Sequence, residues 1–255
     1  MKKLLTLIVC ILVGNFTVAQ DDLFLIFEFM KVDESQQAAY GEIEDFWEKI
    51  HEQRVKSGDI IGWDLWILGP GGEEQGFQYV TVTLFNDPVK MFDGGNFGVA
   101  LKAAYPNMAE DELNKTFNKT SNARDLAVRI YMKQIAATKD EYDMPMGTIA
   151  TMDMMKVNIG NYDIYEKAES EVFKTLHQKA VDGGNKENWG LLRFMSPIGS
   201  DTYASHMTVS MYKDYAQLLG ANISSTPAQT KMMMDGIAAR DMKYVYTGRL
   251  IRKVR

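Results

Sequence analysis

The sequence predicts an α+β fold made of two consecutive copies of a β-α-β-β-α-β unit. Two observations lead to this prediction: sequence blocks recur in the same order in both halves of the chain, and each half alternates strand-like and helix-like segments in the same way. The composition agrees, because 46% hydrophobic and 24% charged residues over 255 positions are typical of globular proteins.

The start of the chain has the order of a secretory signal. Two lysines precede an apolar run from Leu4 to Val13, and smaller residues up to Ala19 follow. The run is shorter than the ~20 apolar residues that span a bilayer, so we expect a cleaved signal over residues 1–19 and a periplasmic or extracellular protein with no membrane segment. Cleavage would also remove Cys10, the only cysteine, and with it any disulfide or thiol chemistry.

The repeat is visible in four matched blocks. Met30-Lys31-Val32 recurs 125 positions later as Met155-Lys156-Val157. Tyr40 and Tyr165 have the same offset and belong to this block. The other three blocks contain the pairs Trp63 and Trp189, Tyr79 and His206, and Arg124-Asp125 and Arg240-Asp241. Four blocks in the same order are hard to obtain by chance, so we infer a tandem duplication with repeats over residues 20–140 and 141–255.

Each repeat is expected to contain four strands and two helices. In the first, alternating or apolar runs predict strands at 23–32, 63–68, 77–85 and 126–135, with helices at 34–57 and 111–125. In the second, the strands are expected at 148–157, 189–195, 203–212 and 243–253, with helices at 161–181 and 227–240. The first helix of each repeat ends at a glycine, and turns over 69–72 and 196–199 join the middle strands.

That order of elements is the ferredoxin-like unit. Both helices of one unit pack on the same face of its sheet, and a second unit can cover the other face. The doubled unit resembles the dimeric α/β-barrel superfamily, which includes antibiotic-biosynthesis-monooxygenase-like, muconolactone-isomerase-like and chlorite-dismutase-like proteins. The resemblance covers nearly the whole mature chain and rests on element order and duplication. It implies two repeats packed sheet to sheet as an intramolecular barrel, with strand order 4-1-3-2 in each repeat.

Strand alternation separates two faces in each sheet. Val80, Val82 and Leu84 form an apolar face that we expect to pack against the helices. The opposite face, expected to point into the space between the two sheets, carries the polar candidates Glu28, Tyr79 and Thr81 in the first repeat and Asp153, His206, Thr208 and Ser210 in the second.

A carboxylate stands at the same strand position in both repeats, as Glu28 and Asp153. Pairing with the antiparallel neighbour would place Asp153 opposite His206 or Thr208. In the first repeat the same pairing would place Glu28 opposite Tyr79 or Thr81. Burial raises a carboxyl pKa toward values useful for proton transfer, so an Asp153–His206 couple could act as a general base or bind a hydroxylated ligand. The alternative is that these groups only satisfy one another's hydrogen bonds.

Aromatic and basic residues complete the candidate binding site. Trp63 and Trp189 recur at the start of the second strand, either as core residues or as stacking platforms for an aromatic ligand. Arg193 has Ile67 as its counterpart and would suit an anionic ligand in the second repeat only. This asymmetry favours a single site in the second repeat. The catalytic candidates are Asp153 and His206, together with Glu28, the equivalent carboxylate of the first repeat.

No metal or cofactor is expected. His51 and His177 lie on the first helix of each repeat with no second ligand at a suitable spacing, and the methionine clusters fit core packing better than Cu(I) binding. Haem-degrading members of the resembled superfamily place an asparagine, a tryptophan and a histidine around the porphyrin, whereas Glu28 or Asp153 stands at that strand position here.

Three functions remain open. The resemblance implies a cofactor-independent oxygenase or isomerase-type enzyme acting on a small organic molecule held between the sheets. The alternatives are a non-catalytic periplasmic ligand carrier and an envelope scaffold without a ligand. A net charge of −6 argues against non-specific nucleic-acid binding, and a monomer or weak homo-oligomer is expected.

Overall fold

The computed structural model describes residues 22–69, 73–139, 142–220 and 226–255. The expected signal over 1–19 and most of the expected turn over 69–72 lie outside the described residues. Within the described ranges, no helix has the length and apolar character needed to cross a membrane.

The first half of the chain contains every element expected there and two additional short helices. Its elements are β1 (Phe24–Lys31), a 3₁₀ turn (Glu34–Gln36), α1 (Gln37–Lys56), β2 (Gly62–Gly69), a 3₁₀ turn (Glu73–Gln75), β3 (Tyr79–Phe85), α2 (Pro88–Asp93), α3 (Phe97–Ala104), α4 (Glu110–Ala123) and β4 (Asp125–Ala137). The unexpected α2 has clear local causes. Asp87 caps its first turn by accepting from the Val89 N–H at 2.8 Å, and Gly94 ends it with a φ of 79°.

The second half repeats this order with one irregular helix. Its elements are β5 (Ile149–Val157), a 3₁₀ turn (Ile159–Asn161), α5 (Tyr162–Ala168), a π-helical turn (Glu169–Phe173), α6 (Lys174–Asp182), β6 (Asn188–Ser196), β7 (His206–Tyr212), α7 (Tyr215–Gly220), α8 (Pro227–Ala238) and β8 (Arg240–Val254). The expected helix over 161–181 is therefore present, but a π turn interrupts it.

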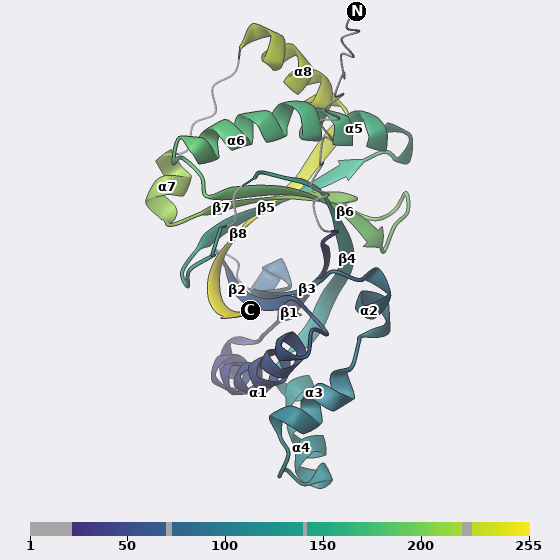
Figure 1. Cartoon of the computed structure of the whole chain (residues 1–255), viewed down its shortest axis with the longest axis vertical. Coiled ribbons are helices and arrows are strands. Elements are labelled where there is room, and N and C mark those ends of the chain that lie inside the picture. The colour runs from purple at the N-terminus through teal and green to yellow at the C-terminus, as the bar shows by residue number, and fades with distance from the viewer. Residues whose placement is uncertain (1–21, 70–72, 140–141, 221–225) are drawn as a thin grey trace, which may run out of the picture.

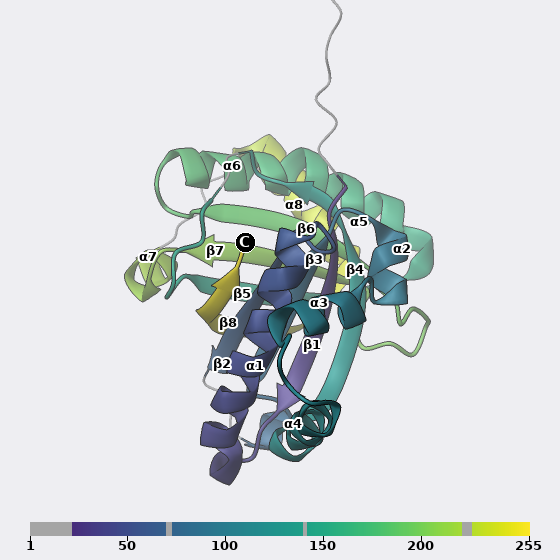
Figure 2. The ribbon, with the colours of Figure 1, turned by 60° about the horizontal axis from the view of Figure 1, so that its bottom comes forward.

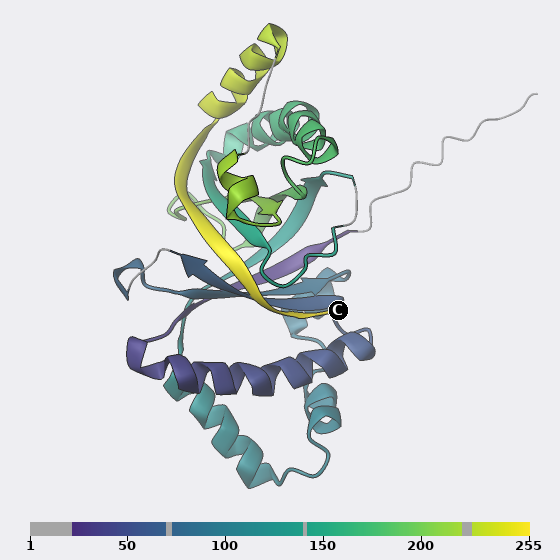
Figure 3. The same ribbon diagram turned by 90° about the vertical axis from the view of Figure 1, so that its left-hand side faces the viewer.

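The eight strands form one closed barrel in the order β1-β3-β2-β8-β5-β7-β6-β4 (Figure 1). Each half contributes four neighbouring strands in the expected order 4-1-3-2. The halves join edge to edge, because β2 pairs with β8 and β4 pairs with β6. Helix α1 lies outside one arc of the barrel and α5 and α6 lie outside the opposite arc (Figure 3). Figure 2 shows α3 and α4 beside α1, where Phe46 and Ile50 form a small core with Phe117.

The barrel interior is apolar, which reverses the expected orientation of the strand faces. Leu25 and Phe27 of β1 and Val80 and Val82 of β3 belong to a core cluster with residues of all eight strands. The opposite face of the same strands packs against α1, as Tyr79 does with Tyr40 at a ring distance of 4.6 Å. Both faces are covered, one by the far arc of the barrel and one by helices. Alternation therefore separates the two faces without identifying which is inside.

Candidate functional site

The two strand carboxylates face the helices and not the space between the sheets. Glu28 pairs with Thr81 in register and Asp153 pairs with Thr208, which confirms one of the two expected alternatives. Thr81 donates to Glu28 at 3.4 Å, and Thr208 donates to Asp153 at 3.2 Å. Burial raises the pKa of Asp153, against the hydrogen bond from Thr208.

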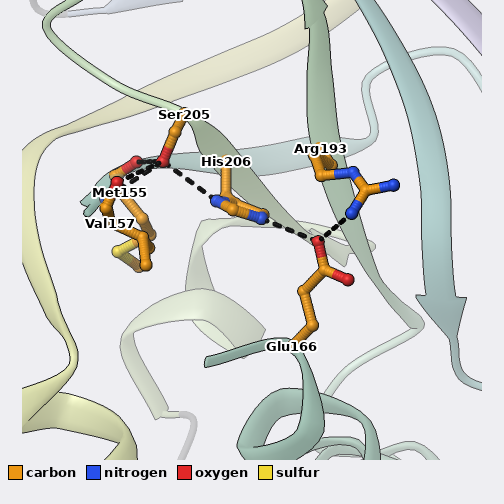
Figure 4. A network of polar contacts seen from close by, with 6 residues as sticks. All are labelled: Met155, Val157, Glu166, Arg193, Ser205 and His206. Atoms are coloured by element: carbon orange, nitrogen blue, oxygen red, sulfur yellow. Dashed lines mark hydrogen bonds and ion pairs between the residues drawn. The ribbon is translucent and has the colours of Figure 1, made fainter. Parts of the chain in front are cut away.

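The expected Asp153–His206 couple is absent, because His206 lies opposite Met155, two positions along the strand. The His206 ring lies instead between two other partners, with Nδ1 3.0 Å from Ser205 Oγ and Nε2 3.0 Å from Glu166 Oε1 (Figure 4). Arg193 donates to the same Glu166 oxygen at 3.0 Å. Burial lowers the pKa of His206, and although burial acts to raise that of Glu166, the His206 hydrogen bond and the Arg193 charge lower it.

This serine–histidine–glutamate order has the residue types of a hydrolase triad but not its accessibility. Ser205 is 3% exposed and His206 is 0% exposed, whereas a nucleophile must reach its substrate. Ser205 Oγ also accepts from the Val157 N–H at 3.0 Å and lies 3.3 Å from the Met155 carbonyl oxygen. We interpret the network as a structural connection that ties the start of β7 to the end of β5 and to α5.

A polar cavity of about 450 Å³ lies between α1 and the outer face of the first half's strands. Of the residues expected to form the site, Glu28, Thr81 and Trp63 line it. The rest of the lining combines aromatic side chains with three arginines and two further acidic residues. These residues include Glu44, Trp47, His51, Arg54, Thr83, Phe85, Phe92, Asp93, Arg124, Arg129 and Tyr131. The cavity therefore offers both charge and flat apolar surface to a ligand.

Glu44 of α1 is the most strongly perturbed acid of this cavity. It is 1% exposed, and burial raises its pKa to about 7 although Arg124 and Tyr40 act in the opposite direction. Its Oε1 lies 3.5 Å from Arg124 Nε. Glu44 Oε1, the Tyr40 hydroxyl and Arg124 Nε are all buried without a hydrogen-bond partner in the described part of the chain. Buried polar atoms are normally paired, so this cluster has unused capacity to bind a ligand.

Glu28 at the other side of the cavity is well paired. Arg129 of β4 donates to it from Nε at 2.8 Å, and its Nη2 lies 2.6 Å from the same carboxylate. Arg54 is also committed, because its Nε donates to Asp59 at 2.7 Å. Glu44 and Arg124 are therefore the cavity's less satisfied charged pair.

The second half repeats the buried cluster as Tyr165, Glu169 and Arg240. Burial raises the pKa of Glu169 to about 7, and Arg240 Nε lies 4.0 Å from its carboxylate. The neighbouring space differs, because Lys186 reaches into it where the first half has Ile60. Its Nζ lies 3.0 Å from His177 Nδ1, donates to Ser210 at 2.8 Å and lies 5.5 Å from the Tyr212 ring centre.

The recurring histidines stack on the recurring tryptophans. His51 lies 4.9 Å from Trp63 and His177 lies 4.8 Å from Trp189, both nearly parallel. Burial lowers the pKa of each histidine to about 3, so both imidazoles are neutral near pH 7. Over the described ranges, no group of three or more His, Cys, Asp or Glu residues is arranged to hold a metal ion.

Several expected site residues lie away from the cavity. Tyr79 donates to Gln37 in the core under α1. Trp189 belongs to the buried core of the second half, and Arg193 and His206 belong to the network of Figure 4. The important residue that the sequence analysis missed is Glu44. A signal for it existed, because Tyr40-x3-Glu44 recurs 125 positions later as Tyr165-x3-Glu169.

Neither protein-family models nor curated proteins match this sequence. Solved structures match the fold over almost the whole chain. A candidate monooxygenase from Lactobacillus acidophilus NCFM has a TM-score of 0.55 at 11% identity, with 92% of this chain and 96% of that chain covered. A candidate monooxygenase from Fusobacterium nucleatum subsp. nucleatum has a TM-score of 0.55 at 12% identity, with 92% of this chain and 94% of that chain covered. An anthrone oxidase-like protein has a TM-score of 0.55 at 10% identity, with 91% of this chain and 92% of that chain covered. At these identities the likeness establishes the fold, an α+β chain with an eight-strand barrel of the dimeric α/β-barrel type.

Proposed function

We propose that this protein binds a small planar organic molecule in the polar cavity under α1 and exchanges a proton with it, as an enzyme of the cofactor-independent oxygenase or isomerase type. The observation that carries the proposal is Glu44. It is a carboxyl group that lines a cavity of about 450 Å³, is almost completely buried and keeps one oxygen without a hydrogen-bond partner.

The residues around Glu44 suit proton abstraction. A carboxyl group with a pKa near 7 is partly ionised at neutral pH and can accept a proton from an acidic O–H or C–H group. The electron pair that stays on the substrate would form a delocalised anion, and the Arg124 guanidinium beside Glu44 would stabilise it. Trp63 and Tyr131 supply aromatic surface for a flat molecule. Return of the proton to another atom would complete an isomerisation, and reaction of the anion with dioxygen would begin an oxygenation.

The proposed site differs from the one expected between the sheets. The polar strand residues face the helices, and the space between the sheets is apolar. We also place the site in the first half and not in the second. Lys186 lies among the second half's counterparts of the cavity residues, where it contacts His177 and Ser210.

We further propose that the two halves, residues 20–140 and 141–255, are tandem repeats. Tyr40 and Glu44 have counterparts 125 positions later, whereas the counterpart of Trp47 is Phe173, 126 positions later. The one extra residue must lie between Glu169 and Phe173, which is the segment that forms the π turn. A π turn accommodates a single inserted residue without rotating the rest of the helix, so it supports the alignment. Export by the signal over 1–19 is likewise part of the proposal.

The test compares two matched variants, Glu44→Gln and Glu169→Gln, with anthrone as the probe. Both glutamates are buried beside a tyrosine and an arginine, but only Glu44 lines the polar cavity described above. Deuterium exchange at the acidic carbon of anthrone reports proton abstraction, and oxygen uptake reports any subsequent oxygenation. We expect Glu44→Gln to reduce exchange by about 100-fold or more and Glu169→Gln to leave it close to wild type.

Other results would contradict the proposal. Equal loss in both variants would show that Glu44 acts through the fold and not on the substrate. Anthrone binding to the wild type without exchange or oxygen uptake would favour the ligand carrier. Native mass spectrometry of the purified protein would show whether a small molecule co-purifies with it, and such a molecule would then replace anthrone as the probe.

A further inference from the structure

The barrel interior contains a second cavity, which the proposed function does not use. Its volume is about 180 Å³, and it lies among inward-facing side chains such as Leu25, Phe27, Trp66 and Met152. The polar cavity lies on the other face of the same strands, so the two spaces are separated by the sheet.

Small residues on one arc of the barrel create this cavity. An eight-strand barrel is just wide enough for side chains to fill it or for one small ligand to be held. Phe27 and Trp66 reach in from one side, but Ala150 of β5 and Gly190 of β6 do not reach back. A Cβ atom added at Gly190 would meet the Ala136 carbonyl oxygen at 3.7 Å, an ordinary van der Waals contact, so this position could hold a side-chain carbon but contributes none to fill the interior.

The lining selects against a charged ligand. Asp64 is the one charged residue among the described lining residues. Arg255 Nη2 donates to its Oδ2 at 2.9 Å and balances its charge, although its Oδ1 has no hydrogen-bond partner among the described residues. Tyr142 is also occupied, with its hydroxyl 3.0 Å from Thr148 Oγ1. The remaining surface is mostly aliphatic, aromatic and thioether, and thioethers adapt well to varied apolar shapes.

From these observations we infer that the barrel interior is a second binding site, which takes one uncharged apolar molecule of about the size of a monocyclic aromatic hydrocarbon. Apolar protein cavities of about 150 Å³ remain dry and bind benzene, so the present cavity has the volume and lining for such a ligand. The site is independent of the polar cavity and needs none of its residues.

Methionine methyl NMR with toluene as the probe tests this inference in the full mature chain. Met144, Met152 and Met211 line the barrel cavity, whereas Met91 lines the polar cavity. We expect toluene to shift the first three methyl signals along one saturable curve and to leave the Met91 signal unchanged. A shift of Met91 of equal size, or shifts that grow linearly without saturation, would overturn the inference.

A pair of matched variants separates binding from general core effects. Val209 and Val128 are both half-buried and pack against the same barrel core, but only Val209 lines the cavity. We expect Val209→Trp to abolish saturable toluene binding and Val128→Trp to retain it within about two-fold. If Val209→Trp does not fold, Leu84→Trp places the same ring at another half-buried lining position. Wild-type toluene affinity in a folded lining variant would refute the assignment.

Discussion

Glu44 and Glu169 lose their hydration on folding, and in the described part of the chain Glu44 Oε1 gains no hydrogen-bond partner. Each lies beside a tyrosine and an arginine, and for each, burial is the main cause that raises the pKa from 4.5 to about 7. A protein can retain such groups for function although they reduce stability, because a carboxyl group with a pKa near 7 gains and loses its proton readily at neutral pH. At the scale of the residue, Glu44 therefore connects stability to the proposed chemistry.

Glutamine substitution should reveal this cost through its pH dependence. Between pH 4.5 and 7 the folded state holds more protons than the unfolded state, so the free energy of unfolding falls as the pH rises through this window. The loss approaches about 3 kcal/mol per glutamate by pH 8. Glutamine cannot ionise, so Glu44→Gln should raise the free energy of unfolding at pH 8 by up to about 3 kcal/mol and change it little at pH 5. Urea unfolding at both pH values measures this, and equal differences at pH 5 and pH 8 would contradict it.

The residue-level site could be predicted only in part. The strand order predicted that Glu28 lies opposite Tyr79 or Thr81, and the structure shows that the partner is Thr81. The partner of His206 could not be predicted, because Glu166 comes from α5 and its helical position carries no repeat signal. The location of the polar face was wrong, since both faces of these strands are covered and alternation alone does not distinguish a barrel interior from a helix-covered surface.

At the scale of elements, the most informative irregularity is the π turn Glu169–Phe173. The first half has a continuous helix at the corresponding place, α1. The order and approximate bounds of the strands were predictable, because each is a distinct apolar or alternating run. The short helices α2, α3 and α7 were missed, since six to eight residues are too few for a helical period to be recognised.

Removing one exposed residue from each helix tests the origin of the π turn. Deletion of Glu171 should convert the turn into regular α-helix and leave the following buried residues in place, so the free energy of unfolding should change by about 1 kcal/mol or less. Lys49 of α1 is also exposed, but α1 is a regular helix without an inserted residue, so the deletion of Lys49 cannot be compensated in the same way. It should rotate the rest of the helix by about 100° and cost several times more, because Ile50 and Arg54 would leave their buried places. Similar losses in the two deletion variants, measured by urea unfolding, would argue against an inserted residue.

At the scale of the whole molecule, the closure of the barrel joins the halves into one unit. β8 pairs with β5 along Arg240–Arg249 and with β2 along Thr247–Val254, so it belongs to both halves. β4 bridges β1 and β6 in the same manner. No local pattern predicts the pairings β2–β8 and β4–β6, because they join strands from different halves of the chain. The resemblance to dimeric barrels implied a union of the halves, but the closed strand order required the structure.

Separation of the halves should therefore remove stability that neither half can replace alone. A chain of residues 20–140 would expose the free edges of β2 and β4 and the inward-facing Phe27 and Val82, which lie in the barrel core. Exposed edges and apolar faces favour association, so we expect each half alone to aggregate or to pair with a second copy of itself. Mixed refolding of 20–140 with 141–255 should give a 1:1 complex with the sedimentation coefficient and cooperative unfolding of the full chain. A single half that sediments as a monomer and unfolds cooperatively would show that the closing pairs β2–β8 and β4–β6 are dispensable, and the barrel would then be two domains in contact.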